Sequence, residues 1–319
     1  MLASLDVTDS AKHTAAPAVS VIIATYRRPH LLPRAIRSVL AQTFTDFELI
    51  VVDDGSGDET AEVVAGFVDP RLRYICLETN GGVANARNQA VERAQGEWLV
   101  FVDDDDRVEP TFLAELVDLI SHALPTVGFV WSWKSIVELT ATGERVINLE
   151  TYRVVSPQPI PGADLLHRPR GGSGGLVVRR CVFEEMGGFD PAFYSRGDTD
   201  LLLRMAVNYD YAVCPRPLYF LTKMDGPQLT DLSEKKGRSL ELLIERHAHR
   251  IGPGTLRSWR MSAARNYFAS GKRAEGRRVM SQLIRARPTS ARSWILWAAF
   301  ELAPWLPGPL RRRIFRPHR

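Results

Sequence analysis

Four short apolar runs in the first third of the chain constrain its fold more than any other feature. They are rich in β-branched residues and lie at residues 19–24, 47–52, 72–77 and 98–102. Segments with apolar residues at helical spacing follow the first three runs and begin near Pro29, Asp58 and Val83. Strands that alternate with helices predict an α/β fold, a doubly wound and mainly parallel sheet with helices on both faces.

Each apolar run is followed by polar residues or glycine. Thr25 comes directly after the first run, Asp53 and Asp54 after the second, and residues 80–82 soon after the third. The fourth run leads into four consecutive aspartates, residues 103–106. Because ligands bind beyond the carboxyl ends of the strands in such sheets, we expect these groups to form one site.

The four aspartates indicate a metal-assisted site. Adjacent carboxylates repel one another, and a divalent cation relieves that repulsion. Hard oxygen ligands suit Mg²⁺ or Mn²⁺, which would in turn hold the phosphates of a substrate. A solvated acidic turn that caps a helix starting near Pro110 explains the cluster taken alone equally well.

The second half of the chain is less regular. We expect a strand at residues 127–133, a turn within a strand pair at 141–144, and a helix at 201–207. The glycine-rich stretch at 171–175 either approaches a ligand closely or is a plain flexible connector. After Lys235 the pattern is helical, with a hairpin that turns at Gly271. The predicted organisation is therefore a disordered tail (1–18), a sheet domain (19–234) and a basic C-terminal helical region (235–319).

Composition and charge narrow the class of protein. The 319 residues are 45% hydrophobic and 24% charged, as in an ordinary soluble globular protein. Cys76, Cys181 and Cys214 lack metal-ligand spacing, so we interpret them as reduced core thiols of a cytoplasmic protein. The net charge of +4 is modest, but from Lys235 onward basic residues far outnumber acidic ones, which favours contact with a polyanion or an anionic membrane face. A basic helical surface without a partner is the alternative. The chain carries no recognisable nucleic-acid recognition motif.

Seven motifs, in the right order, resemble those of family 2 glycosyltransferases. They occur at residues 20–26, 38–44, 48–56, 80–88, 101–106, 187–190 and 197–204. The resemblance covers roughly residues 19–230. It implies a GT-A fold and transfer of a sugar from a nucleoside diphosphate to an acceptor hydroxyl, with inversion at the anomeric carbon. The motifs leave the donor sugar, the acceptor, the linkage and the oligomeric state open.

The resemblance implies how the donor would be bound. Asp54 would accept a hydrogen bond from the nucleobase edge, which suits uracil or thymine and hence a UDP- or dTDP-sugar. An Asx turn that caps the next helix is the alternative for Asp53 and Asp54. Asp105, with Asp103, would ligate Mn²⁺ or Mg²⁺, and Asp103 or Asp104 would contact the ribose. The remaining candidates for the nucleotide site are Thr25, Tyr26, Asn80, Gly81 and Arg87.

The resemblance also implies the acceptor side of the site. Asp198 would be the general base that removes the proton of the acceptor hydroxyl. Many relatives have Glu at the position of Gly197, and many have His where this chain has Asp225. Arg204 is expected to be structural, paired with an acidic neighbour. The candidates for a loop that contacts the acceptor or the donor sugar are Trp131, Trp133, Gly172, Ser173 and Gly174.

Two other functions share parts of this pattern. A sugar nucleotidyltransferase would need a glycine-rich basic loop after the first strand, and residues 25–29 contain no glycine. A non-catalytic nucleotide-binding module would have lost the metal or base carboxylates, and both are present.

The C-terminal segment suggests a role at a membrane surface. It combines Trp294, Trp297, Phe300 and Trp305 with a basic run at 311–313, a composition typical of membrane-interface segments. We expect a cytoplasmic enzyme of cell-surface polysaccharide or glycolipid assembly, acting on a saccharide or lipid-linked acceptor. Peripheral contact with the inner face of the plasma membrane is one interpretation. Packing on the catalytic domain or a dimer contact is the other.

Overall fold

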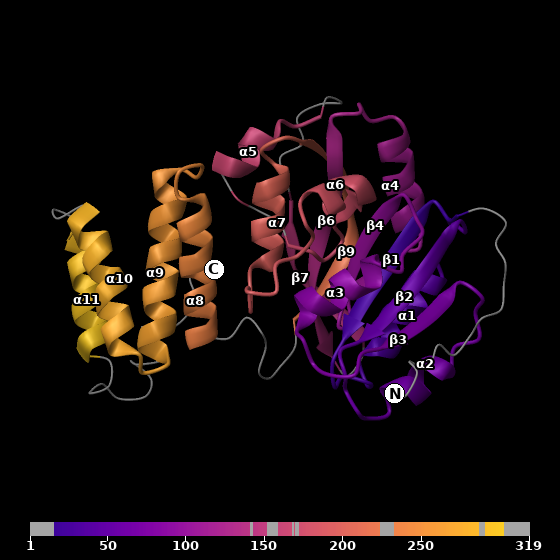
Figure 1. The fold of residues 1–319 in the computed structure, drawn as a ribbon, viewed down its shortest axis with the longest axis horizontal. Coiled ribbons are helices and arrows are strands. Elements are labelled where there is room, and N and C mark those ends of the chain that lie inside the picture. Colours follow the sequence, from indigo (N-terminus) through magenta and orange to yellow (C-terminus); the bar gives the residue numbers. More distant parts are fainter. Residues whose placement is uncertain are drawn as a thin grey trace. The chain divides into compact units, whose positions relative to one another are not determined.

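The computed structural model describes residues 16–140, 143–151, 159–167, 169, 172–223, 233–286 and 291–302. The chain divides into two units. The first contains the sheet and its helices, and the second contains the helices that follow residue 233 together with segments 166–169 and 192–196. Figure 1 shows the strands gathered in the first unit, and helices with their connecting loops in the second.

The four predicted apolar runs form the parallel half of the sheet. They are β1 (Val19–Thr25), β2 (Phe47–Asp53), β3 (Leu72–Cys76) and β4 (Trp98–Asp103), in the order β3-β2-β1-β4. The connecting helices are α1 (Leu32–Leu40), α2 (Thr60–Ala65) and α3 (Val83–Val91). In register, Thr25 lies beside Asp53, and Ala24 lies beside Asp103. The predicted doubly wound arrangement is confirmed for this half, and the polar strand ends meet at one edge.

Alternation along the strands places helices on both faces of the sheet. Val21 and Ile23 of β1 belong to the core that includes Ile36 of α1 and residues of α4 (Phe112–Ser121). On the opposite face, the ring of Phe101 lies 5.7 Å from that of Phe183 in α6 (Arg180–Glu185). Each fully buried aliphatic or aromatic side chain contributes about 1.5–3 kcal/mol, so this packing fixes the strand ends that carry the polar groups.

The other half of the sheet is mixed. β8 (Val177–Arg179) runs antiparallel between β4 and β6 (Val127–Thr140), and β7 (Gly143–Glu150) pairs antiparallel with β6. β9 (Asp210–Lys223) runs parallel to β6 and antiparallel to the short β5 (Arg107–Val108). The sequence pattern missed β9, because Pro215 and Pro217 interrupt it and proline argues against an interior strand. The β6–β9 register shifts where these prolines occur.

α7 (Gly197–Met205) begins four residues before the predicted start, so Asp198 and Asp200 lie in its first turn. Arg204 Nε lies 2.8 Å from a carboxylate oxygen of the fully buried Asp200, which confirms the expected acidic partner. The guanidinium of Arg204 also donates to the backbone carbonyls of Met186 and Gly188. This network ties α7 to the glycine turn at 187–188. A short helix, α5 (Gly162–His167), begins in the same unit, which includes its residues up to Leu165.

The second unit comprises α8 (Glu234–His247), α9 (Pro253–Ala269), α10 (Arg273–Ala286) and α11 (Ala291–Leu302). Gly271 has a φ of 78° between α9 and α10, and the predicted hairpin turn there is confirmed. Phe300 is buried and stacks on Phe268, with ring centroids 5.1 Å apart. Trp294 is 47% exposed, whereas Trp305 and the basic run at 311–313 lie outside the described residues. None of the described helices is long and apolar enough to cross a membrane.

The cysteines differ from the expectation that all three are core thiols. Cys76 and Cys181 are exposed, and Cys214 is buried. Cys76 is the last residue of β3, at the edge of the sheet, and its thiol lies 3.9 Å from a carboxylate oxygen of Asp53.

Candidate active site

The aspartate run begins at the last residue of β4, and its middle carboxylates are held by β1 and the loop after it. Thr25 Oγ1 donates to Asp104 at 2.8 Å. Arg28 Nη1 lies 3.1 Å from both a carboxylate oxygen of Asp104 and one of Asp105. No sequence motif assigned a role to Arg28. A cation directly after the first strand was the available signal, since that loop reaches the same sheet edge as the aspartates.

A chain of hydrogen bonds joins Asp103 to the proposed base. Arg87 Nη2 donates to Asp103 Oδ1 at 2.5 Å, and Arg87 Nη1 donates to Ser173 Oγ at 2.9 Å. The backbone N–H of Ser173 in turn donates to Asp198 Oδ2 at 3.2 Å. Arg87 is buried, so it positions the carboxylate of Asp103 and the 172–174 loop. Four predicted site residues from separate parts of the sequence are therefore brought together.

Asp106 is buried, and its carboxylate is bonded to groups within the protein. Its carboxylate accepts hydrogen bonds from the hydroxyl of Tyr219 at 2.7 Å and from the backbone N–H of Thr222 at 2.7 Å. The same hydroxyl accepts a hydrogen bond from the backbone N–H of Asp103 at 3.2 Å. A Cβ added at Gly174 or Gly175 would lie 2.7 Å from the Tyr219 side chain. Those glycines therefore permit the 172–175 loop to lie against this tyrosine.

Burial and mutual repulsion disfavour the ionised aspartates. Burial raises the pKa of Asp104 to about 6, and Arg28 opposes that rise. Burial and then repulsion by Asp103 raise the pKa of Asp105. Burial also raises the pKa of Asp106 well above its ordinary value. Additional positive charge at this edge would therefore stabilise the ionised cluster.

The carboxylates fit a divalent cation whose coordination is completed by the phosphates of a substrate. Among the described residues, no group of three or more acidic, histidine or cysteine side chains has a metal-binding arrangement. Asp103 and Asp105 nevertheless keep 35% and 20% of their side-chain surface exposed. Magnesium is commonly held by one or two protein carboxylates together with substrate phosphates and water. Two accessible carboxylates under mutual repulsion match that pattern.

Asp53 and Asp54 are both buried and already accept several hydrogen bonds. The carboxylate of Asp54 accepts from the backbone N–H groups of Gly81 and Gly82, at 2.8 and 2.7 Å. Asp53 accepts from Ser56 at 3.0 Å and from the hydroxyl of Tyr74 at 2.8 Å. Asp53 thus orders the turn at residues 53–56, and these bonds do not reach α2, which begins at Thr60, so the alternative of a helix cap is not supported for Asp53. Asp54 anchors the 80–82 loop, and direct contact with a nucleobase stays a prediction.

The other predicted nucleotide-site residues are accessible. Tyr26 is 37% exposed, and the guanidinium of Arg27 lies 5.1 Å from the centre of its ring. Asn80 and Gly81 are exposed. A Cβ added at Gly81 would lie 2.4 Å from Asn85 Nδ2, so a larger residue here would have to displace that side chain.

The predicted sugar-contact residues separate into two groups. Gly172, Ser173 and Gly174 lie beside Asp198 or Tyr219. Trp131 does not reach a ligand site, because it is fully buried with its ring 5.4 Å from Phe129. The expectation for Trp131 is therefore corrected to a core role. Trp133 is partly exposed, and Gly171 and Asp225 lie outside the described residues.

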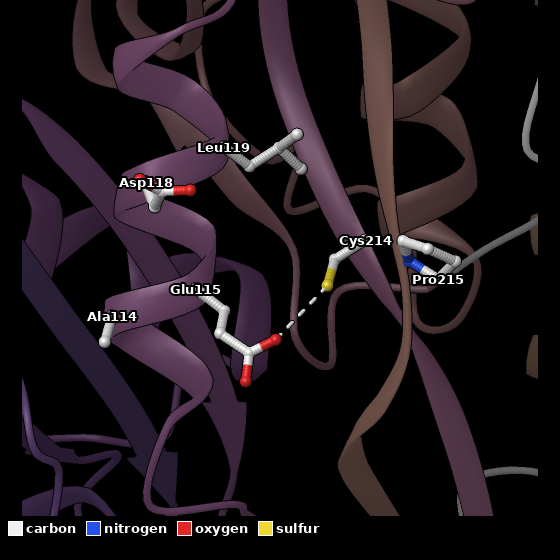
Figure 2. A pocket seen from close by; sticks show the side chains of 6 residues that line it. All are labelled: Ala114, Glu115, Asp118, Leu119, Cys214 and Pro215. Carbon is white, nitrogen blue, oxygen red and sulfur yellow. Dashed lines mark hydrogen bonds between the residues drawn. The ribbon is translucent and has the colours of Figure 1, made fainter. Parts of the chain in front are cut away.

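A surface pocket lies apart from these groups, between α4 and β9. It is lined by Ala114, Glu115, Asp118, Leu119, Cys214 and Pro215. Figure 2 shows the thiol of Cys214 directed at Glu115, with Sγ 3.8 Å from a carboxylate oxygen. Burial and then the nearby carboxylate raise the pKa of this thiol, which keeps it protonated and poorly nucleophilic. None of the aspartates of the run lines this pocket.

Comparison with known sequences identifies the family. Residues 20–154 match Glycosyl transferase family 2. The chain is 40% identical over 209 residues to Escherichia coli WcaA, a protein named as a glycosyl transferase of colanic acid biosynthesis; the match spans 60% of this chain and 67% of WcaA. It is also 40% identical over 102 residues to the succinoglycan biosynthesis protein ExoO of Rhizobium meliloti, a match that spans 32% of this chain and 29% of ExoO.

Two solved structures share the fold. The first is S. aureus TarS 1–349 in complex with UDP-GlcNAc, with a TM-score of 0.65, 19% identity, and coverage of 93% of this chain and 90% of the other. The second is the mannosyltransferase PcManGT of Pyrobaculum calidifontis in complex with GDP-Man and Mn²⁺, with a TM-score of 0.56, 20% identity, and coverage of 94% and 84%. The protein belongs to glycosyl transferase family 2 and has the GT-A fold.

Proposed function

We propose that this glycosyltransferase moves a sugar from a UDP-sugar to an acceptor hydroxyl with inversion, in the assembly of a cell-surface polysaccharide or glycolipid. The observation that carries the proposal is the hydrogen-bonded chain from Asp198 through Ser173 and Arg87 to Asp103. These hydrogen bonds link the partly buried carboxylate of Asp198 to the aspartate cluster. The colanic acid and succinoglycan names of the two relatives support the product class.

Asp198 suits the role of general base. Its Oδ1 accepts from the backbone N–H of Thr199 at 2.7 Å, and its Oδ2 accepts from that of Ser173. These bonds orient the carboxylate and leave lone pairs for an acceptor proton. Asp198 takes that proton while the acceptor oxygen bonds to the anomeric carbon, and the electrons of the broken C–O bond leave with the diphosphate.

The donor would be held at the other end of this chain of residues. Asp105, with Asp103, would bind Mn²⁺ or Mg²⁺, and the Mn²⁺ in the PcManGT complex is consistent with such an ion. When bound, the cation acts as a Lewis acid that offsets charge on the leaving diphosphate. The exposed residues Tyr26, Asn80 and Gly81 would line the nucleobase pocket. The UDP-GlcNAc in the TarS complex favours uridine as the base.

Replacement of the base tests the proposal. A positioned general base contributes about 10²- to 10⁴-fold to turnover. We expect Asp198→Asn to lower transfer by that order, because an amide cannot take the proton. UDP affinity, measured by calorimetry with Mn²⁺, should stay within about twofold.

Asp118→Asn is the matched control, because Asp118 is a highly exposed aspartate in another helix. A mixture of UDP-, dTDP- and GDP-sugars with Mn²⁺ supplies donors, and release of free nucleoside diphosphate is measured. Near-normal release by Asp198→Asn would contradict Asp198 as the base. Absence of release and of nucleotide binding by the unmodified protein would instead favour a role outside sugar transfer.

A further inference from the structure

Lys134 is a buried cation inside the candidate active site that none of the roles above uses. It lies on β6 and is 3% exposed. The β6–β9 register places it beside Tyr219, and its ammonium lies 5.3 Å from the centre of that ring. Because the hydroxyl of Tyr219 contacts both Asp103 and Asp106, the side chain of Lys134 lies close to the aspartate cluster.

The acidic residues that attract Lys134 belong to several different elements of the sheet unit. Its ammonium is attracted by Asp103 and Asp106 after β4, by Asp198 of α7, and by Glu150 of β7. Within the described part of the chain, no oxygen atom accepts a hydrogen bond from this ammonium. An ammonium carries three donors and is costly to bury unless they are satisfied, so a ligand that presents oxygen atoms in this site would stabilise Lys134.

The position of Lys134 between the two ends of the reaction axis indicates which part of the donor it would contact. In an inverting displacement, the acceptor oxygen, the anomeric carbon and the leaving oxygen stand in line. Under the proposed function, Asp198 marks the acceptor end, and Asp103 with Asp105 marks the diphosphate end. The transferred sugar occupies the space between them. Lys134 lies against Tyr219, whose hydroxyl contacts Asp103, and the 172–175 loop that lies against the same tyrosine contacts Asp198, so Lys134 is near both ends.

We infer that Lys134 donates hydrogen bonds to hydroxyl oxygens of the transferred sugar and takes part in selecting the donor. This inference rests on the proposed function. An ammonium only donates, so it favours sugars that present an oxygen toward β6 and disfavours deoxy sugars at that carbon.

Binding measurements on Lys134→Met test this inference. Methionine keeps most of the length of the side chain and removes the charge. Affinities are measured with Mn²⁺ for UDP, dTDP and GDP, and for UDP-GlcNAc, UDP-glucose, UDP-glucuronic acid, dTDP-glucose and GDP-mannose. Each sugar nucleotide is compared with its own sugar-free diphosphate. Lys134→Gln, which keeps donors without charge, replaces Met if that variant fails to fold. Lys223→Met controls for loss of one positive charge, since Lys223 is exposed at the end of β9.

A hydrogen bond from a charged donor is worth about 1.5–3 kcal/mol, which is roughly ten- to hundredfold in affinity. We expect a loss of that size for the preferred sugar nucleotide and less than about twofold for its sugar-free diphosphate. Equal loss for both would overturn the inference and place Lys134 at the diphosphate. No change for either would make it a structural counter-ion. A wild-type protein that binds every sugar nucleotide no better than its diphosphate would overturn it as well. Because these are binding ratios, they stand apart from the turnover test on Asp198.

Discussion

Removal of the Asp54 carboxylate separates two roles for this residue. In the structure, both of its oxygens accept hydrogen bonds from the backbone of the 80–82 loop. Family resemblance instead implies contact with the nucleobase. Asp54→Ala would lower both stability and nucleotide affinity if Asp54 anchors the loop, whereas loss of a base contact would lower affinity alone.

The expected loss of stability follows from these two bonds. Each hydrogen bond to a charged group is worth about 1.5–3 kcal/mol, which gives about 3–6 kcal/mol for the pair. Gly81 is exposed and Gly82 is partly exposed, so water can satisfy their N–H groups after the substitution. We therefore expect a net loss at or below the lower limit of that range, about 2–3 kcal/mol. For a unit of roughly two hundred residues, each kcal/mol lowers Tm by about 2–4 °C, so the shift is about 4–12 °C.

Differential scanning calorimetry and UDP titration measure the two effects on the same samples. Asp58→Ala is the control, because the Asp58 carboxylate accepts hydrogen bonds from the backbone N–H and the hydroxyl of Thr60, at 3.0 and 2.5 Å, in the helix that follows. It should lower Tm by a smaller amount and leave UDP affinity unchanged. Unchanged Tm with weakened UDP binding in Asp54→Ala would refute loop anchoring and support direct contact with the base.

Three further predictions concern the metal, the core and the C-terminus. EDTA should abolish transfer, and Asp105→Ala should do the same while Tm changes little, because Arg28 keeps its contact with Asp104; full activity in excess chelator would contradict the metal assignment. Arg204→Met should cost about 3–5 kcal/mol in urea unfolding, since it leaves the carboxylate of Asp200 buried without this cation; a loss below about 1 kcal/mol would show that other groups suffice. Truncation after Leu302 should abolish salt-sensitive sedimentation with anionic liposomes while helix content is kept, because Phe300 stays packed on Phe268; equal sedimentation of both forms would place the contact elsewhere or exclude it.

Local sequence determined the parallel half of the sheet and the polar edge beside it. β-branched runs, helical spacing and the residues directly after each strand are properties of neighbours in the chain. Parallel strands must then present their carboxyl ends together, which is why the amino-acid sequence alone suffices to place Thr25 and Asp103 in one site. Asp198 was assigned to the same site through the order of the family motifs.

Only the tertiary structure decided which of these side chains face a ligand. Trp131 is buried in an aromatic cluster, and Asp54 accepts hydrogen bonds from the backbone of the 80–82 loop. Arg28 and Lys134 enter the site through contacts with residues distant in sequence. The position of Lys134 in the site depends on the pairing of β6 with β9. The prolines of β9 interrupt the alternation of residues by which a strand is recognised in a sequence. Such pairing is decided by packing between segments that are distant in the chain, so it cannot be predicted from a residue's immediate neighbours.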